Sequence, residues 1–196
     1  MSQSLLSYKK IHCVGIGGSG MSGLAQILGQ SKIAVSGSDE KDSFQLQQLS
    51  KQGMKIHTGH QQANLPDDTE AVIYSAAIPL TNPEIVLAKQ RDLPLFTYPE
   101  AIGLLTRLYK TICVCGTHGK TTTTGLLASA LIADKQDPTI IVGSTLQELG
   151  NKNNRLGKSA YFIVESCEYR RGFLNYQPSV IVITNIEADH LDYFKD

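Results

Sequence analysis

The sequence lacks the features that would direct it to a membrane, to a long nucleic-acid contact or out of the cell. Its 18 lysine and arginine residues balance 18 aspartate and glutamate residues over 196 positions. A chain without net charge is not drawn to polyanions or anionic membranes, so any contact with phosphate must be local. The N-terminus has no apolar core of signal-peptide length, and no apolar run reaches the roughly 18 residues that cross a bilayer. We therefore expect a cytoplasmic protein with no nucleic-acid or membrane partner.

Cysteine is also scarce. The four cysteines, Cys13, Cys113, Cys115 and Cys167, lie within or beside apolar strand-like runs. The spacing of Cys113 and Cys115 has no second pair to complete a zinc site. We interpret all four as buried, reduced thiols.

Short apolar runs alternate with helix-like stretches along the whole chain, which has 41% hydrophobic residues for a core. This alternation is typical of α/β folds with parallel sheets and crossover helices. A first set has strands expected at 11–14, 33–36, 55–57, 71–75 and 94–98, with helices after a glycine-rich loop and at 44–52 and 83–91. A second set has strands expected at 111–115, 139–142, 161–165 and 180–184, with a helix at 121–133 and a polar loop or hairpin at 147–159.

Each set opens with its own strand–loop–helix phosphate motif, and this duplication predicts two domains. We place them at residues 1–108 and 109–196. The first is expected to be a Rossmann-like parallel sheet domain. The second is expected to be part of a P-loop ATP-binding α/β domain.

The glycine-rich loop at residues 15–20 reads Gly-Ile-Gly-Gly-Ser-Gly and follows the first apolar run. Glycines permit a tight turn and close backbone approach, while the next helix offers N–H groups to a diphosphate. Asp39 ends the next strand, where dinucleotide-binding folds place an acid on a ribose hydroxyl. This order predicts a nucleotide site. The alternative is that the glycines only pack the helix against the strand.

Two further polar residues follow expected strands of the first domain. His60 and Ser75 would line the ligand crevice, because ligands bind beyond the carboxyl ends of parallel strands. A lone loop histidine is more often a surface residue, and that alternative stays open for His60.

A second and sharper motif, Gly-Thr-His-Gly-Lys-Thr, occupies residues 116–121 after an apolar run. It is a short form of the P-loop, because Val114 stands where the common pattern has its first glycine. Backbone N–H groups of this loop can cradle phosphate, and Lys120 can place its charge at the β and γ phosphates. The Thr121 hydroxyl can join a Mg²⁺ shell. The motif predicts binding of ATP and Mg²⁺.

Acidic residues after two later apolar runs could complete the metal site. Glu165 ends one run with Glu168 close behind, and Glu187, Asp189 and His190 follow another. Strand ends of open α/β sheets face the ligand crevice, and carboxylate oxygens suit Mg²⁺. The alternative for Glu168, Glu187 and Asp189 is that they are solvated charges.

Together these segments resemble the Mur ligases of bacterial cell-wall synthesis, and most closely the branch that joins L-alanine to UDP-N-acetylmuramate. The likeness is carried by residues 12–23, 36–39, 75–79, 116–124 and 184–190, and it covers almost the whole chain. It implies that the first domain holds the UDP part of the nucleotide sugar and that the second binds Mg²⁺-ATP. The UDP-sugar contacts it implies are Gly15, Gly17, Gly18, Ser19, Gly20, Met21, Asp39, His60 and Ser75. The ATP contacts it implies are Gly116, Thr117, His118, Gly119, Lys120, Thr121, Thr122 and Asn185.

The resemblance also implies the chemistry. Lys120, Glu165 and His190 would be the catalytic residues, and Thr121, Glu165 and His190 the metal ligands. ATP would phosphorylate the muramyl carboxylate, and the amino group of L-alanine would attack the resulting acyl phosphate. Positioning and charge stabilisation would supply most of the rate, with no side chain acting as a nucleophile.

The chain departs from the family pattern in two ways. Residues 167–171 read Cys-Glu-Tyr-Arg-Arg where the family commonly has an acidic run, and members of the family continue well beyond 196 residues. We therefore expect an N-terminal fragment that is inactive by itself. The alternatives are the related ligase that attaches a recycled tripeptide and a non-catalytic UDP-sugar-binding module. A nicotinamide-dependent oxidoreductase is disfavoured by the second loop, and the oligomeric state is left open.

Overall fold

The computed structural model describes residues 4–188 and residue 193, and the chain divides into two compact units, residues 1–101 and 102–196. Each unit contains an open α/β sheet, so the expected fold class is confirmed. Helix α4 (Tyr98–Thr106) runs across the division, and the boundary expected after residue 108 stays a prediction. Among the described residues, none of the helices has the length and hydrophobicity of a membrane-spanning segment.

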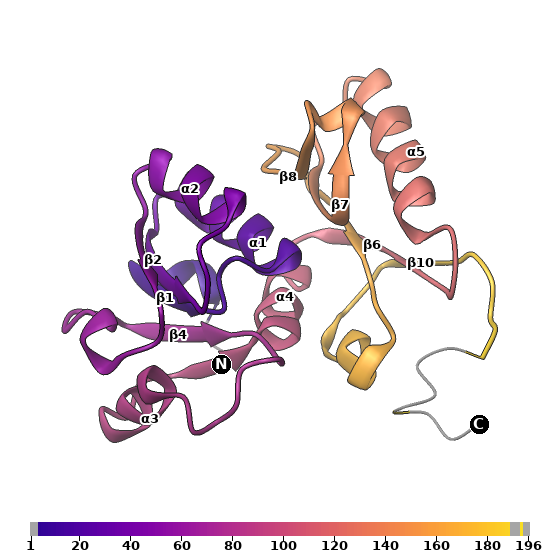
Figure 1. The fold of residues 1–196 in the computed structure, drawn as a ribbon. Helices are drawn as coiled ribbons and strands as arrows, with labels where there is room; N and C mark the ends of the chain where they lie inside the picture. The colour runs from indigo at the N-terminus through magenta and orange to yellow at the C-terminus, as the bar shows by residue number, and fades with distance from the viewer. Residues whose placement is uncertain (1–3, 189–192, 194–196) are drawn as a thin grey trace. The chain divides into compact units, whose positions relative to one another are not determined.

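The first unit is built on a five-stranded parallel sheet of order β3-β2-β1-β4-β5. Its strands are β1 (Lys10–Val14), β2 (Ala34–Asp39), β3 (Lys55–Thr58), β4 (Ala71–Tyr74) and β5 (Leu95–Thr97). Helices α1 (Ser19–Gln30) and α2 (Phe44–Lys51) cover one face, and α3 (Pro83–Gln90) covers the other (Figure 1). The strand order reverses between β1 and β4, and ligand crevices of open sheets lie at this reversal.

The helices of this unit begin where the sequence supplies caps. The Ser43 side chain accepts a hydrogen bond from the Leu46 N–H at the start of α2. Asn82 caps α3 in the same way, and Pro83 occupies the first turn, where its missing N–H is not needed. Short 3-10 turns at Leu5–Ser7 and Gln62–Asn64 complete the unit. Its core includes Val14, Leu65, Val72, Ile85 and Ala88.

Gly37, in the middle of β2, allows this strand to lie close to the end of β1. A Cβ placed on Gly37 would come within 2.6 Å of both the Cys13 carbonyl oxygen and Ile16 Cδ1. We expect Gly37→Ala to lower the free energy of unfolding by about 1–3 kcal/mol, because the crowding includes backbone that cannot move aside. Chemical denaturation measures this. The matched control is Gly18→Ala, whose new Cβ would meet nothing closer than 3.7 Å, and an equal loss in both variants would contradict the explanation.

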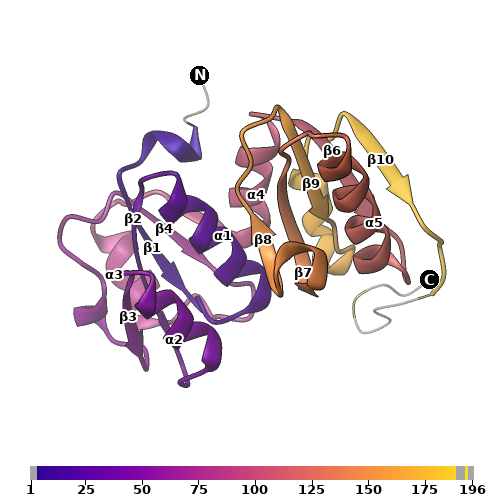
Figure 2. The same cartoon turned by 90° about the horizontal axis from the view of Figure 1, so that it is seen from above.

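The second unit has a sheet of order β10-β6-β9-β7-β8 (Figure 2). Its strands are β6 (Lys110–Cys115), β7 (Thr139–Leu146), β8 (Lys152–Arg155), β9 (Tyr161–Glu165) and β10 (Val180–Ile183). The central strand β6 leads into α5 (Lys120–Ala133), which packs on β6, β7 and β9. Strands β6, β9 and β10 are parallel, and their register places Glu165 and Ile183 beside the end of β6. Their carboxyl ends therefore meet at one edge.

The stretch 147–159, expected as a loop or hairpin, forms a hairpin: it contains the 3-10 turn Gln147–Leu149 and β8, which pairs antiparallel with β7. The cysteines differ in part from expectation. Cys167 is exposed rather than buried, because it follows the end of β9, and Cys115 is only partly buried. Cys13 and Cys113 are buried, and burial raises the pKa of each thiol to about 12, so they stay protonated.

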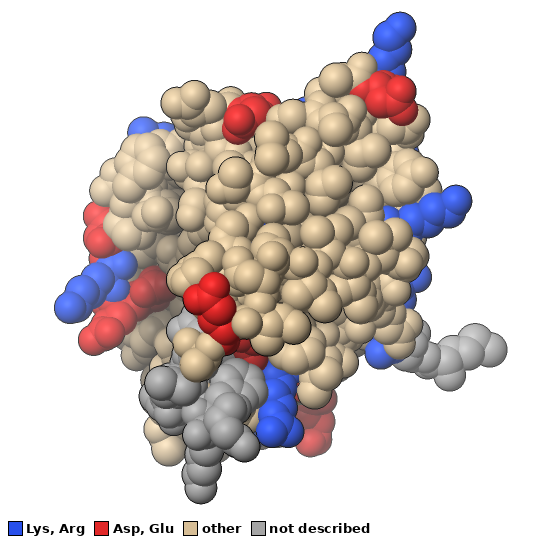
Figure 3. All heavy atoms as spheres, turned by 90° about the vertical axis from the view of Figure 1, so that its right-hand side faces the viewer, with Lys and Arg blue, Asp and Glu red and all other residues tan. Residues whose placement is uncertain are grey.

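Strand β10 and helix α5 of this unit carry exposed apolar side chains. In β10, Val180, Ile181 and Ile183 are 50–59% exposed, and in α5 Leu126 is 67% exposed. Figure 3 looks at the side on which α5 and β10 lie, and most of the surface there belongs to residues other than Lys, Arg, Asp and Glu. Strand β10 also forms an edge of the sheet, because β6 is its only partner in the described residues.

Candidate functional site

The loop between β6 and α5 has the geometry of a phosphate cradle. Gly119 is the N-cap of α5 in the left-handed region (φ 79°), and Gly116 has φ 127°. A Cβ on Gly116 would overlap Thr184 Oγ1 and come 2.7 Å from the Asn185 carbonyl oxygen. Glycine is therefore required there by space and by backbone conformation. The first backbone N–H groups of α5 have no acceptor within the helix, so they can donate hydrogen bonds to a bound anion.

Lys120 lies in the first turn of α5 and folds back over the loop. Its Nζ donates to the carbonyl oxygens of Gly116 (2.5 Å) and Thr117 (3.0 Å). Glu168 Oε1 lies 3.7 Å from the same nitrogen. The ammonium group is thus held beside the phosphate cradle. A bound phosphate could replace the two carbonyl oxygens as its hydrogen-bond acceptor. The alternative for Glu168 was a fully solvated charge. Its side chain is only 23% exposed and lies beside Lys120.

Thr121 and Glu165 are brought together, although they are 44 residues apart in sequence. The Thr121 hydroxyl donates to Glu165 Oε2 at 3.0 Å, and the Gly143 N–H donates to the same oxygen at 2.9 Å. A hydroxyl and a carboxylate are hard oxygen ligands, and Mg²⁺ usually takes one or two carboxylates together with substrate phosphates. This pair fits Mg²⁺ beside an ATP phosphate. The third expected ligand, His190, and Asp189 lie outside the described residues.

The segment after β10 holds the other side of the loop. Asn185 accepts from the His118 N–H (3.0 Å) through Oδ1 and approaches the His118 carbonyl (3.2 Å) through Nδ2. The Thr117 hydroxyl contacts the backbone of Glu187, with distances of 3.1 and 3.2 Å. Asn185 is thus placed against the phosphate loop. Thr122 is exposed one residue beyond the loop.

The glycine-rich loop of the first unit lies at the reversal between β1 and β4. The N–H groups of Gly15 and Ile16 both donate to the Ser38 carbonyl oxygen, at 2.8 and 3.0 Å. Gly15 has φ 79°, and a Cβ there would come 3.0 Å from the Cβ of Ser75. The loop is therefore fastened between the ends of β2 and β4. It leads into α1 through Gly18, its N-cap.

Among the residues expected to bind a UDP-sugar, Asp39 and Met21 already have roles in the unit itself. Asp39 Oδ2 accepts from the Gly17 N–H at 2.8 Å, and Oδ1 accepts from the Glu40 N–H at 2.8 Å. Met21 is 3% exposed, so its side chain belongs to the core and only its backbone could meet a ligand. Gly20 faces the ring of Tyr98, because a Cβ there would lie 2.7 Å from the Tyr98 hydroxyl. Contacts of these residues with a nucleotide sugar stay predictions.

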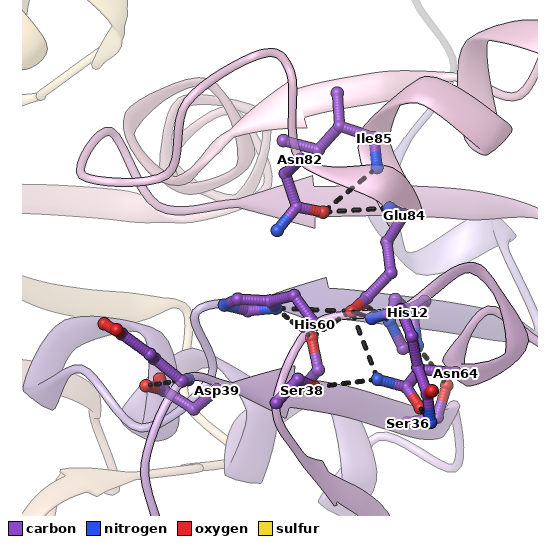
Figure 4. Close-up of polar contacts among 12 residues, drawn as sticks. His12, Ser36, Ser38, Asp39, His60, Asn64, Asn82, Glu84 and Ile85 are labelled. Atoms are coloured by element: carbon purple, nitrogen blue, oxygen red, sulfur yellow. Dashed lines mark hydrogen bonds and ion pairs between the residues drawn. The ribbon is translucent and has the colours of Figure 1, made fainter.

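His60 belongs to a buried polar network that the sequence did not indicate (Figure 4). Its centre is Glu84, in the first turn of α3, whose side chain has no exposed surface. Glu84 Oε2 lies 2.7 Å from His12 Nε2 and accepts from the Ser38 hydroxyl at 2.6 Å. Its Oε1 faces His60 Nδ1, the Gln61 N–H and Asn64 Nδ2, each at 3.2 Å.

These contacts decide the charge state of Glu84. Burial by itself raises the pKa of this carboxyl, but the hydrogen bonds from His12, Ser38 and Asn64 outweigh burial and hold the pKa below its ordinary value. All five neighbours can present a hydrogen to the carboxylate, which as an anion only accepts. Glu84 is therefore an ionised carboxylate that ties β1, β2 and the loop after β3 to α3.

His57, on β3 beside this network, gives the first unit a pH dependence. Its Nε2 is buried and has no hydrogen-bond partner among the described residues. Burial lowers the pKa of His57 below 6.5, assisted by Lys55 and His12 and opposed by Glu84. The unfolded chain therefore binds the proton more readily, so the stability contributed by His57 is complete above pH 6.5 and declines as the pH falls below it. We expect His57→Gln to reduce the stability lost between neutral and mildly acidic pH, as measured by urea denaturation. Identical losses in wild type and variant would contradict this.

Comparison with known proteins gives a consistent match over both units. Residues 10–110 match the family model "Mur ligase family, catalytic domain", and residues 114–196 match "Mur ligase middle domain". The UDP-N-acetylmuramate–L-alanine ligase of Clostridium beijerinckii is 47% identical over 96% of this chain and 41% of its own length. The ligase of the same name from Clostridium kluyveri is 44% identical over the whole chain and 43% of its own length. The chain thus spans about two fifths of these relatives.

Solved structures share the architecture. The UDP-N-acetylmuramate-alanine ligase from Thermotoga maritima has a TM-score of 0.86 at 34% identity, covering 93% of this chain and 43% of that one. A UDP-N-acetylmuramate:L-alanyl-gamma-D-glutamyl-meso-diaminopimelate ligase from Neisseria meningitides has a TM-score of 0.87 at 28% identity. This match covers 96% of the present chain and 64% of the Neisseria meningitides chain.

Proposed function

Because this chain belongs to the Mur ligase family, we propose that it is the N-terminal part of an ATP-dependent ligase that joins L-alanine to UDP-N-acetylmuramate. The observation that carries the proposal is the shared edge of the second unit. There the phosphate loop, the Thr121–Glu165 pair and Asn185 converge from different strands. The 47% identity to an L-alanine ligase supports the choice of substrates.

In this proposal the first unit binds the UDP group and the second binds ATP. The loop amides and Lys120 would hold the β and γ phosphates of ATP, while Thr121 and Glu165 would hold Mg²⁺, with His190 as a further expected ligand. Mg²⁺ supplies charge stabilisation to the transferring phosphoryl group. The muramyl carboxylate attacks the γ-phosphorus and displaces ADP, and the amine of L-alanine then displaces phosphate from the acyl group. The protein contributes alignment and fixed positive charge, which are the main terms in phosphoryl transfer.

Calorimetric titration of the chain tests the two binding sites. UDP-N-acetylmuramate and Mg²⁺-ATP are each expected to bind, and NADH is not expected to compete with the nucleotide sugar. NADH binding in preference to a uridine nucleotide would instead favour an oxidoreductase. The isolated chain is expected to release no ADP in the presence of both substrates.

A chimera tests the reaction itself. Residues 1–196 replace the aligned segment of the Clostridium beijerinckii ligase, which supplies the remainder of that enzyme. We expect ADP release that depends on UDP-N-acetylmuramate and L-alanine. The similarity to the Neisseria meningitides ligase supports the tripeptide L-alanyl-γ-D-glutamyl-meso-diaminopimelate as the second candidate acceptor. Dependence on this tripeptide rather than L-alanine would assign the chain to that branch, and nucleotide-sugar binding without turnover in the chimera would favour a non-catalytic module.

A further inference from the structure

The carboxylate of Glu165 is held by donors from two other elements, and both donate to the same oxygen. The Thr121 hydroxyl of α5 lies 3.0 Å from Glu165 Oε2, and the backbone N–H of Gly143 in β7 donates to it at 2.9 Å. Two donors occupy both lone pairs of a carboxylate oxygen. Oε1 accepts no hydrogen bond from the described residues. The two oxygens therefore differ, since Oε2 is anchored and Oε1 keeps its lone pairs for a ligand.

Gly143 also makes room for this carboxylate by having no side chain. A Cβ built on Gly143 would lie 3.2 Å from Oε1, 3.3 Å from Oε2 and 3.4 Å from Cδ of Glu165. These nearly equal distances show that the flat face of the carboxylate is turned toward the position that a side chain would take. The φ angle of Gly143 lies outside the left-handed region, so the backbone itself does not require glycine. The glycine thus serves the carboxylate rather than the strand.

The place of Gly143 in the sheet explains how its N–H reaches a side chain. The parallel pairing of β7 with β9 runs from Thr139 to Ile141, which lies opposite Val164. On the other side, the pairing of β7 with β8 is irregular between Ile141 and Leu146. Gly143 lies beyond the first ladder and within the irregular stretch of the second. Irregular pairing of this kind is common beside active sites, because it frees backbone groups from the ladder.

We propose that Gly143 is a positioning residue for the metal site: its N–H and the Thr121 hydroxyl anchor Oε2 of Glu165, so that Oε1 is the oxygen presented to Mg²⁺. The proposal rests on the proposed binding of Mg²⁺-ATP by the second unit. Groups that orient a metal ligand commonly change metal affinity by about 10- to 100-fold when they are altered. Here the orienting group is a backbone N–H.

Calorimetry with and without the metal tests this role. The methyl group of Gly143→Ala would displace the carboxylate by a few tenths of an ångström, but the N–H stays. We expect the wild type to bind Mg²⁺-ATP more tightly than ATP in EDTA. Gly143→Ala should lose about 10-fold in affinity for Mg²⁺-ATP, the lower end of that range, and bind metal-free ATP like the wild type.

The matched control is Ser144→Ala, which alters the next exposed residue of β7 and should change neither affinity. Thermal unfolding verifies that each variant is folded. A general distortion of the phosphate loop would weaken binding of ATP with and without Mg²⁺ alike. Such equal losses, or wild-type affinity for Mg²⁺-ATP in folded Gly143→Ala, would overturn the proposal.

A double variant tests whether Gly143 acts through Glu165. In Glu165→Gln the amide oxygen can still accept from Gly143 and Thr121, which leaves an NH₂ group in the place of Oε1. We expect affinity for Mg²⁺-ATP to fall in this variant and Gly143→Ala to cost nothing further in the same background. The same 10-fold loss from Gly143→Ala in both backgrounds would mean that the glycine acts by another route, against the proposal.

Amide NMR of the ligand-free chain tests the anchor without any nucleotide. The spectrum of Gly143→Ala identifies the Gly143 signal. We expect the Gly143 N–H to exchange with solvent more slowly in the wild type than in Glu165→Ala, because the variant lacks its acceptor. Equal exchange rates would contradict the anchor. Slow exchange in a wild-type chain that binds neither Mg²⁺-ATP nor ATP would instead contradict the proposed function.

Discussion

Replacing Glu84 by alanine is expected to lower the free energy of unfolding of the first unit by about 3–5 kcal/mol, because it breaks a buried ionic network by removing the shared partner. His12 is fully buried and would lose the partner of its Nε2. Ser38, Gln61 and Asn64 would each lose an acceptor as well. A domain of this size is stable by only about 5–15 kcal/mol, so the loss is a large fraction of the total.

Urea denaturation followed by circular dichroism measures this effect. The matched control is Glu40→Ala, which removes an exposed carboxylate and is expected to change stability by no more than about 0.5 kcal/mol. The pKa of Glu84 is depressed in the folded state, so its stabilisation is present above its ordinary value of 4.5 and is lost as the pH falls through the folded pKa. The gap between wild type and Glu84→Ala should therefore narrow at acid pH. A constant gap, or equal effects of the two substitutions at neutral pH, would show that the network contributes little.

Replacing Lys120 by alanine is expected to weaken binding of Mg²⁺-ATP by about 10- to 150-fold, the range for loss of a hydrogen bond to a charged group. The ammonium group already lies against the loop, where it contacts the carbonyls of Gly116 and Thr117. In the chimeric ligase the same change is expected to lower kcat by a factor on the order of 10²–10³, because the charge that develops on the transferring phosphoryl group loses the ammonium group of Lys120.

Calorimetry on the chain and steady-state kinetics on the chimera measure these two effects. The control is Lys152→Ala on β8, which removes an exposed lysine from the same unit and should leave both quantities unchanged. Thermal unfolding of both variants separates loss of ATP contacts from loss of the loop itself. Nucleotide affinity within twofold of wild type in Lys120→Ala would exclude this loop as the phosphate site.

The parts of the site that the sequence predicted are local in the chain. Residues 15–20 and 116–121 each lie between a strand and a helix, so the motifs can be recognised from neighbouring residues, although Ser38 and Asn185 also hold these loops in the fold. The position of Glu165 was inferred over a longer distance, because strand ends meet at one edge of a parallel sheet. The register of β6 and β9 pairs Glu165 with Val114 near the end of β6, and its carboxylate accepts from the Thr121 hydroxyl. The ligand contacts of all these residues remain predictions.

The parts that the sequence did not reveal depend on distant pairs. His12 and Glu84 are 72 residues apart. In the sequence His12 stands in an apolar strand, and Glu84 looks like an ordinary acid at the start of a helix. A histidine within an apolar strand is the one available signal that a distant polar partner exists. Strand β8 reads Lys-Asn-Asn-Arg, which has no apolar alternation, and it forms because β7 offers an edge for antiparallel pairing.

The apolar edge at β10 affects how this protein behaves in solution. A strand that reads Val-Ile-Val-Ile, with no charge, proline or bulge, has none of the features by which sheets prevent pairing with other molecules. Its outer N–H and C=O groups form a template for a strand from another copy. The exposed side chain of Leu126 on α5 adds to the apolar surface. We therefore expect the purified chain to aggregate as its concentration rises, and Ile181→Lys to reduce this aggregation, as measured by light scattering.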